Sequence, residues 1–336
     1  MLFEGLIDYC SQKNKIKLKL LNQNNFKLKN ILPPSQKALY NKNLLYINKI
    51  DSKKTIQITN IDHLLELTSI ISSFPIISDN IHSFDSITQK NILKLQSLKY
   101  LHISNNCDIN NINHLKKLKK LECRDASQIK QNSIRKLTNI VRLNCSNNNK
   151  IVSLSVMNKL KILICCDKSI DQEAINKIKK LTFIDCGYNT KINNLNHLVD
   201  LKYVMCCGYY SGINTIGVNK LFKVKRLFCN FNHGLVDIHH MTNLIELSCN
   251  YSSVNQNSIN HLNKLKILQC IQNNNIKNIS NLKNLEILYY WRNNLDFNIN
   301  DFPKLKFIRM RGERNLIMIP ILFLCFLMVF FYYFLI

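Results

Sequence analysis

Glycine and catalytic sequence motifs are both scarce in this chain. Seven of its 336 residues are glycine. No G-x-G-x-x-G segment, Walker loop or G-x-S-x-G motif occurs, and no Cys-x-x-Cys pair has a partner. So few glycines leave little material for loops that cradle phosphate. We therefore predict that the protein is not an enzyme, with no catalytic residues, no metal ligands and no cofactor.

Acidic residues are few as well. The chain has 21 Asp and Glu against 46 Lys and Arg, a formal net charge of +25 at pH 7. Such an excess can indicate nucleic-acid binding. The lysines, however, recur beside each unit of a hydrophobic repeat instead of forming one patch, which is typical of a solvated edge. We expect no nucleic-acid partner, and binding that weakens steeply with salt would contradict this.

One phrase, L-x-x-L-x-C-x-x-N, dominates the rest of the sequence, with other apolar residues replacing some of its members. Its restarts lie 20 to 23 residues apart. A fixed period of this size indicates a solenoid, whose function lies on a surface. The restarts are Leu98, Leu118, Ile140, Leu160, Leu181, Leu201, Val224, Leu244, Leu265, Leu285 and Leu305.

The fourth and sixth positions of the phrase predict a short strand that points both side chains into the core, because strand side chains alternate. The sixth position is cysteine in consecutive repeats. Neighbouring strands lie about 4.8 Å apart, whereas a disulfide needs Cβ atoms roughly 3.8 Å apart. We interpret the column as reduced, buried thiols, which implies a reducing compartment. Its members are Cys123, Cys145, Cys165, Cys186, Cys206, Cys229, Cys249 and Cys270.

The second half of each repeat alternates between two lengths, which gives a superperiod of about 40 to 43 residues. The longer repeats carry Gln131–Ile134, Gln172–Ile175 and Gln256–Ile259, which are typical of a cap followed by one or two helical turns. The ninth position favours asparagine, whose amide can bond to the backbone where the chain leaves the strand. These asparagines are Asn106, Asn148, Asn189, Asn232, Asn273 and Asn293.

With this phrase, residues 98 to 311 resemble the leucine-rich repeat proteins, particularly the short, cysteine-rich kind. The bias toward asparagine, isoleucine and lysine is similar to that of repeat proteins of giant viruses and amoebae. The resemblance implies an α/β solenoid, with parallel strands on the concave face and short helices or turns on the convex face. It also implies a non-enzymatic interaction module.

The concave face should present the third, fifth and seventh positions of each phrase. Half-exposed aromatic residues and arginines match the composition of binding hot spots. We predict that a protein or peptide docks there, and alanine at Tyr203 and Trp291 should then weaken binding. The alternative is that strands favour such residues regardless of partners. The predicted contact residues are Tyr100, Arg124, Arg142, Phe183, Tyr203, Met205, Arg226, Phe228, Tyr289, Trp291 and Arg309.

Residues 316 to 336 contain no charged residue. As a helix they would span about 31 Å, enough for a bilayer core. Arg309, Arg311 and Arg314 precede the run, which favours a cytosolic location for the repeats, in the host cytoplasm if the protein is viral. We predict a single-pass transmembrane tail anchor. The alternatives are a hydrophobic cap on the last repeat or the translation of T-rich sequence.

The first 97 residues are less regular. Residues 61 to 97 are predicted to be a capping or degenerate repeat. Residues 1 to 60 contain Leu6-Ile7-x-Tyr9-Cys10 and Ile16-x-Leu18-x-Leu20-Leu21-Asn22, which resemble the later part of an F-box without its opening Leu-Pro. That resemblance implies an adaptor that brings substrates to a cullin ubiquitin ligase through a Skp-type partner. The alternative is a pair of amphipathic helices over 6 to 28 that cap the solenoid.

Overall fold

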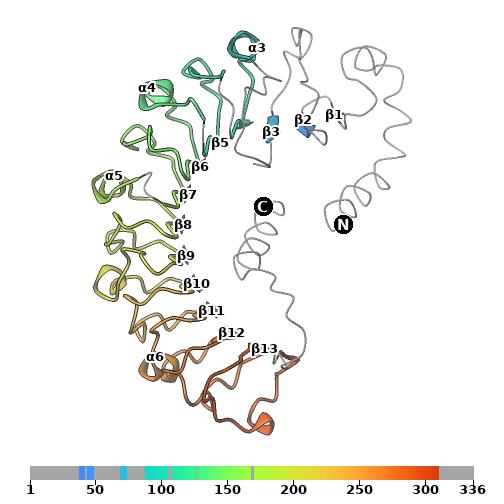
Figure 1. The fold of residues 1–336 in the computed structure, drawn as a ribbon. Helices are drawn as coiled ribbons and strands as arrows, with labels where there is room; N and C mark the ends of the chain where they lie inside the picture. The colour runs from blue at the N-terminus through green and yellow to red at the C-terminus, as the bar shows by residue number, and fades with distance from the viewer. Residues whose placement is uncertain are drawn as a thin grey trace.

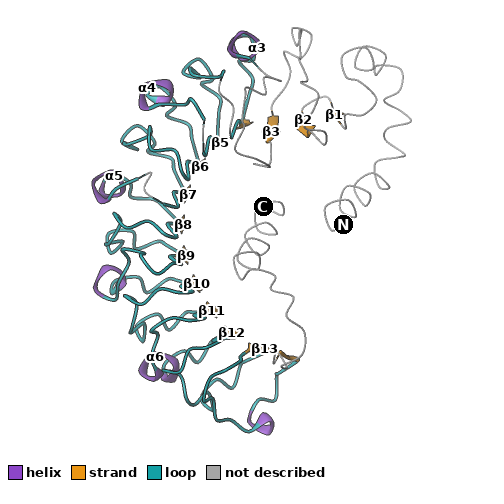
Figure 2. Ribbon diagram, in the orientation of Figure 1, coloured by secondary structure: helices purple, strands orange, loops and turns teal. Residues whose placement is uncertain are grey.

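The computed structural model describes residues 38–41, 44–48, 69–73, 88–104, 108–125, 127–167 and 170–309. The chain forms an arc with the strands on its inner side and the short helices on its outer side (Figures 1 and 2). Fourteen strands make one sheet, in which each strand bonds to its neighbours in sequence. All pairs are parallel except β1 with β2. This confirms the predicted parallel-strand solenoid.

The repeat strands are three residues long and stack in strict register, so that equivalent positions of successive repeats lie side by side. They are β4 (Tyr100–His102), β5 (Lys120–Glu122), β6 (Arg142–Asn144), β7 (Ile162–Ile164), β8 (Phe183–Asp185), β9 (Tyr203–Met205), β10 (Arg226–Phe228), β11 (Glu246–Ser248), β12 (Ile267–Gln269), β13 (Ile287–Tyr289) and β14 (Phe307–Arg309).

Three earlier strands extend the sheet at its N-terminal end. They are β1 (Ala38–Asn41), β2 (Leu44–Asn48) and β3 (Ser69–Ser73). The parallel ladder thus begins at β2, before Leu98. The sequence predicts a helical or F-box-like segment over 1 to 60, yet its described residues are strands, in keeping with the strand preference of their tyrosine and isoleucine residues. The F-box-like motifs themselves, within residues 6 to 22, lie outside the described residues.

Helical turns occur in alternate repeats on the outer side. They are α3 (Gln89–Leu93), α4 (Gln131–Ile134), α5 (Gln172–Asn176), η2 (Ile216–Val218), α6 (Gln256–Asn260) and η3 (Ile299–Asp301). This alternation confirms the predicted superperiod. Within the described ranges, no helix combines the length and hydropathy needed to cross a bilayer. The predicted anchor, 316 to 336, lies outside these ranges.

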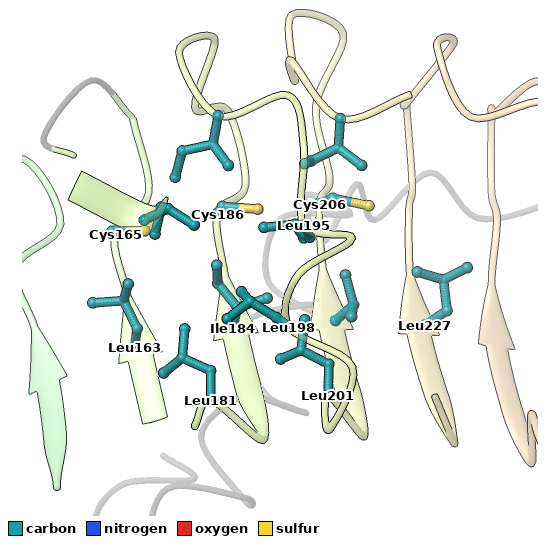
Figure 3. Close-up of a cluster of buried hydrophobic side chains, with 14 of the residues drawn as sticks. Leu163, Cys165, Leu181, Ile184, Cys186, Leu195, Leu198, Leu201, Cys206 and Leu227 are labelled. Carbon is teal, nitrogen blue, oxygen red and sulfur yellow. The ribbon is translucent and has the colours of Figure 1, made fainter. Parts of the chain in front are cut away.

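The core consists of stacked columns of leucine, isoleucine and cysteine. Figure 3 shows Cys165, Cys186 and Cys206 in one row along successive strands. All eight cysteines of the predicted column have 0% exposed surface, which confirms their place in the core. The Cys186 thiol donates to the carbonyl of Met205, with Sγ 3.5 Å from the oxygen. Burial raises the pKa of the Cys206 and Cys270 thiols to about 12, so these groups stay protonated at neutral pH.

The ninth-position asparagines join each repeat to the one before it. The buried Asn189 amide donates to the carbonyls of Cys165 and Ile170, at 3.1 and 2.9 Å. Its Oδ1 accepts from the backbone N–H groups of Lys191 and Ile192. Equivalent bonds by Asn148, Asn232 and Asn273 confirm the predicted role of this position. Asn106 lies outside the described residues.

A glutamine at the start of each α-helix joins the long repeats to the short ones. The Gln172 Oε1 accepts from the backbone N–H groups of Asn193 and Asn194, at 3.0 and 2.9 Å. Its Nε2 donates to the Asn194 carbonyl at 2.7 Å. Gln89, Gln131 and Gln256 make the same three bonds. One side chain thus satisfies three backbone groups 21 to 22 residues further along the chain.

Histidines on the outer side have a structural role. His114, His197 and His240 each hydrogen-bond to a carbonyl in the helical turn of the preceding repeat, those of Ile92, Ile175 and Val218. His261 instead bonds to the carbonyl of Asn257 within its own turn. These hydrogen bonds place the four histidines on the convex side of the arc.

Candidate functional site

Three rows of side chains line the concave face. The middle residue of each strand from β4 to β13 is buried in the core, so the first and third residues face the opposite side of the sheet. The backbone ladder continues beyond the strands, as in the bond from the Asp167 N–H to the Gly187 carbonyl at 3.0 Å. We call the first strand residues the first row, the third strand residues the second row, and the residues two positions later the third row.

At the N-terminal end of the described repeats, these rows carry an ionic cluster of Tyr100, His102, Glu122 and Arg142. The Tyr100 hydroxyl donates to Glu122 Oε1 at 3.1 Å. Arg142 Nη2 lies 3.6 Å from the same oxygen, and His102 Nδ1 lies 3.8 Å from Oε2. Burial lowers the pKa of His102, so the imidazole is neutral at neutral pH and Arg142 balances the carboxylate. The cluster satisfies its own charge.

The middle of the face carries an apolar cluster, separate from the main core. Ile164, Phe183 and Met205 form its centre, with 4%, 5% and 8% of their surfaces exposed. Four partly buried residues pack against it: Ile162, Cys166, Tyr203 and Phe228. The Phe183 and Tyr203 ring centroids lie 6.2 Å apart.

Two acids of this face border the apolar cluster. Glu246 is buried, and its Oε2 lies 3.2 Å from Arg226 Nε. The Arg226 guanidinium also lies over the Tyr203 ring, 5.5 Å from its centroid. Asp185 lies between Ile164 and Met205 in the second row. It accepts a hydrogen bond from the Gly187 N–H at 3.1 Å, and burial raises its pKa.

Beyond the apolar cluster, a network of amides and a hydroxyl covers the strands. Ser248 Oγ donates to Asn230 Oδ1 at 2.8 Å, and the same oxygen accepts from the Asn250 N–H at 2.8 Å. The Asn250 Oδ1 in turn accepts from the Ile271 N–H at 2.7 Å. This polar stretch separates the apolar cluster from the aromatic residues at the C-terminal end.

The C-terminal end of the described face is aromatic and basic. The Tyr289 and Phe307 ring centroids lie 5.6 Å apart. Trp291 lies under the guanidinium of Arg292, 4.4 Å from the carbon of that group to the ring centroid. Arg309 is exposed.

The predicted contact residues therefore fall into distinct environments along one face. The structure brings Phe183, Tyr203, Met205 and Phe228 together in the apolar cluster. Tyr100 and Arg142 belong to the ionic cluster, whereas Arg124 is partly exposed and forms a 3.6 Å ion pair with Asp125. The predicted set omitted the acids of this face, Glu122, Asp185 and Glu246. The sequence did contain a signal for these residues, because each is an acid at a strand position that faces the concave side, in a chain with few acids.

A second aromatic surface lies at one edge of the arc, where the chain leaves the strands. The Phe231 ring stacks on Tyr251, with centroids 4.8 Å apart, and lies 5.1 Å from the Tyr209 ring. Tyr188, Phe231 and Tyr251 have left-handed backbones, with φ of 57°, 60° and 53°, which is uncommon for bulky residues.

The described residues offer no group of three or more His, Cys, Asp or Glu side chains arranged to hold a metal ion. No family model matches the sequence, and no curated protein matches it. Solved structures do match the fold. An internalin (inlF) from Listeria monocytogenes is 20% identical, with a TM-score of 0.56, and the match covers 81% of this chain and 82% of that one.

A second solved structure also matches the fold. The functional domain of InlJ from Listeria monocytogenes, which includes a cysteine ladder, is 21% identical, with a TM-score of 0.51. The match covers 80% of this chain and 62% of that domain, so this chain spans less than two thirds of its length. The parallel ladder, the leucine and cysteine columns and these likenesses together identify the fold as that of the leucine-rich repeat proteins.

Proposed function

We propose that the protein is a non-enzymatic scaffold that binds a protein or peptide segment on its concave face. The apolar cluster carries this proposal. The face of a sheet that points away from the core is usually polar when only water covers it. Here Ile162, Tyr203 and Phe228 remain partly exposed beside a buried apolar centre, in the central, desolvated arrangement that is typical of binding hot spots.

The burial of the centre divides the predicted residues by role. Phe183 and Met205 are too deeply buried to offer much area to a partner. Tyr203 and Phe228 keep exposed surface and flank them. We therefore assign direct contact to Tyr203 and Phe228, and the support of these two side chains to Phe183 and Met205.

A selection from random peptides tests this function without the need to identify the natural partner first. Full-length protein in detergent micelles is used to select binders from a phage-displayed library of random dodecapeptides. Selected peptides should lose affinity for the Tyr203→Ala and Phe228→Ala variants. Tyr210→Ala is the matched control, because Tyr210 is 79% exposed and lies outside the three rows. Binders insensitive to both cluster variants, or no binders, would overturn the proposal.

We further propose that residues 316 to 336 hold the scaffold at a membrane, with the repeats in the cytosol. The support is the uncharged run in the sequence and the arginines that precede it. In cells, the full chain should resist alkaline extraction from membranes, and its repeats should be cleaved by protease added to the cytosolic side. Release of the full chain into the alkaline supernatant would count against the tether.

A further inference from the structure

The three carboxylates in the concave rows differ in how their charge is balanced. Glu122 lies 3.6 Å from Arg142, and Glu246 lies 3.2 Å from Arg226. Asp185, by contrast, has no lysine or arginine within 4.0 Å among the residues that the structure describes. Within the described part of a chain with a net charge of +25, this is the acid of the concave rows that lacks a cation.

Asp185 is buried despite its unbalanced charge, with 8% of its surface exposed. Its hydrogen-bond donors are the Gly187 N–H and the Cys166 thiol, which are both neutral. A carboxylate offers about four lone-pair sites, so these two donors leave acceptor capacity unused. A buried carboxylate without a counter-ion is costly, and a cation supplied by a partner would remove that cost.

No large side chain of the third row lies beside Asp185. The third row is made of small residues beside it: Ser146, Cys166, Gly187 and Cys207. Gly187 does not have the left-handed backbone that would demand glycine. A Cβ atom at Gly187 would lie 3.4 Å from Asp185 Oδ1, an ordinary contact. The missing side chain therefore has no steric cause here, and no Cβ atom of residue 187 covers this side of the carboxylate.

We propose that Asp185 accepts the cationic side chain of a bound peptide, so that the preferred ligand presents lysine or arginine beside a bulky apolar residue. The apolar residue would contact Tyr203 and Phe228, and the ammonium or guanidinium group would donate to Asp185. This proposal rests on the proposed function and adds the chemistry of the partner to it.

The same library, selected in parallel on three proteins, tests the partner's chemistry. Peptides selected by the wild-type chain should be enriched in lysine or arginine next to leucine, isoleucine or phenylalanine. The Asp185→Asn variant should lose that enrichment while keeping the apolar preference. Glu122→Gln is the matched control, because Glu122 already has a cation, and it should select the same peptides as the wild type.

A double-mutant cycle on one selected peptide measures how strongly Asp185 and the cation of the peptide interact. Asp185→Asn should weaken its affinity about tenfold or more, the size expected for a charge-assisted hydrogen bond. Replacing the cation of the peptide by a neutral isostere should cause a similar loss on the wild type and almost none on Asp185→Asn. Gly187→Ala adds a methyl group beside the carboxylate and should weaken binding without lowering the melting temperature.

The outcomes separate the two proposals. Peptides that depend on Tyr203 and Phe228 but show no preference for cations, or bind Asp185→Asn equally well, would overturn the cation acceptor and leave the scaffold intact. Peptides that depend on none of these side chains would overturn both. Thermal unfolding of each variant checks that lost binding does not come from lost structure.

Discussion

The framework of the solenoid and its concave face differ in how strictly they repeat. In the framework, the same side chain makes the same bonds wherever it recurs along the repeats, as Gln172 and Asn189 illustrate. On the concave face, an ionic cluster, an apolar cluster and an amide network follow one another along strands of identical geometry. Positions that build the fold are therefore periodic, whereas positions free of that task vary.

Removal of a framework amide should have the largest effect on stability. Asn189→Leu leaves two carbonyls and two N–H groups without their partner inside the protein. We expect a loss of about 3 to 5 kcal/mol in the free energy of unfolding, because each buried group left unsatisfied costs roughly 1 to 3 kcal/mol. Urea denaturation followed by circular dichroism measures it. Asn293→Leu, at a half-buried position, is the control and should cost less.

The ionic cluster should be the part of the concave face most sensitive to a single change. Arg142→Ala leaves the Glu122 carboxylate with the neutral His102 and Tyr100 as its neighbours. Breaking a buried pair by removing one partner costs about 3 kcal/mol or more. Arg226→Ala leaves the buried Glu246 carboxylate without its partner, but it should cost less in the same urea experiment, because the Arg226 side chain is 43% exposed and water can take its place. Equal losses would show that exposure does not distinguish the two pairs.

The glutamine contact should have an intermediate effect. Gln172→Leu removes two accepted bonds and two donated bonds, one to the Asn194 carbonyl and one to the Asn176 side chain. Because these groups lie near solvent, water can replace part of the loss, and we expect about 1 to 2 kcal/mol. The exposed neighbour Glu173 supplies the control, with Glu173→Ala expected near zero. A loss no larger than that of the control would mean that water replaces the glutamine fully.

The smallest expected effect is a gain in stability, whereas the changes above should all cause losses. Burial raises the pKa of Asp185 in the folded protein, so folding favours the protonated acid. The contribution of the protonated Asp185 to stability is fully present below the pKa that this group has in the unfolded chain. It is lost as pH rises through the higher pKa of the group in the folded protein. At pH 7, Asp185→Asn should therefore increase stability, on the order of 1 kcal/mol. The gain should vanish in thermal melts at acidic pH, and a loss at pH 7 would contradict the assignment.

Much of the fold followed from the sequence because a period of 20 to 23 residues determines which positions stack. Once repeats stack in register, Cys186 must neighbour Cys165 and Cys206, and a residue at the sixth position must be buried. The asparagine at position nine and the helical turns of the long repeats could be assigned from the same alignment of repeats. The predicted contact residues were placed on the concave face by the alternation of strand side chains.

The interactions between unlike residues of neighbouring repeats were not predictable in this way. No motif indicated that Gln172 would bond to Asn193 and Asn194, since that contact depends on how a helical turn lies against the next loop. The crowding that buries Phe183 to 5% exposure depends on the curvature of the arc and on its neighbours. The edge column of stacked aromatic residues needed left-handed backbones that a bulky residue rarely adopts.

The sequence by itself determined the period, the core columns and the residues that line the concave face, because these follow from the geometry of one repeat copied many times. Only the tertiary structure decided which concave charges are balanced. Arg142 reaches Glu122 and Arg226 reaches Glu246, whereas Asp185 lies between two apolar neighbours. The physical reason is that charge balance depends on distances of a few ångströms between side chains of different repeats, and those distances are set by packing.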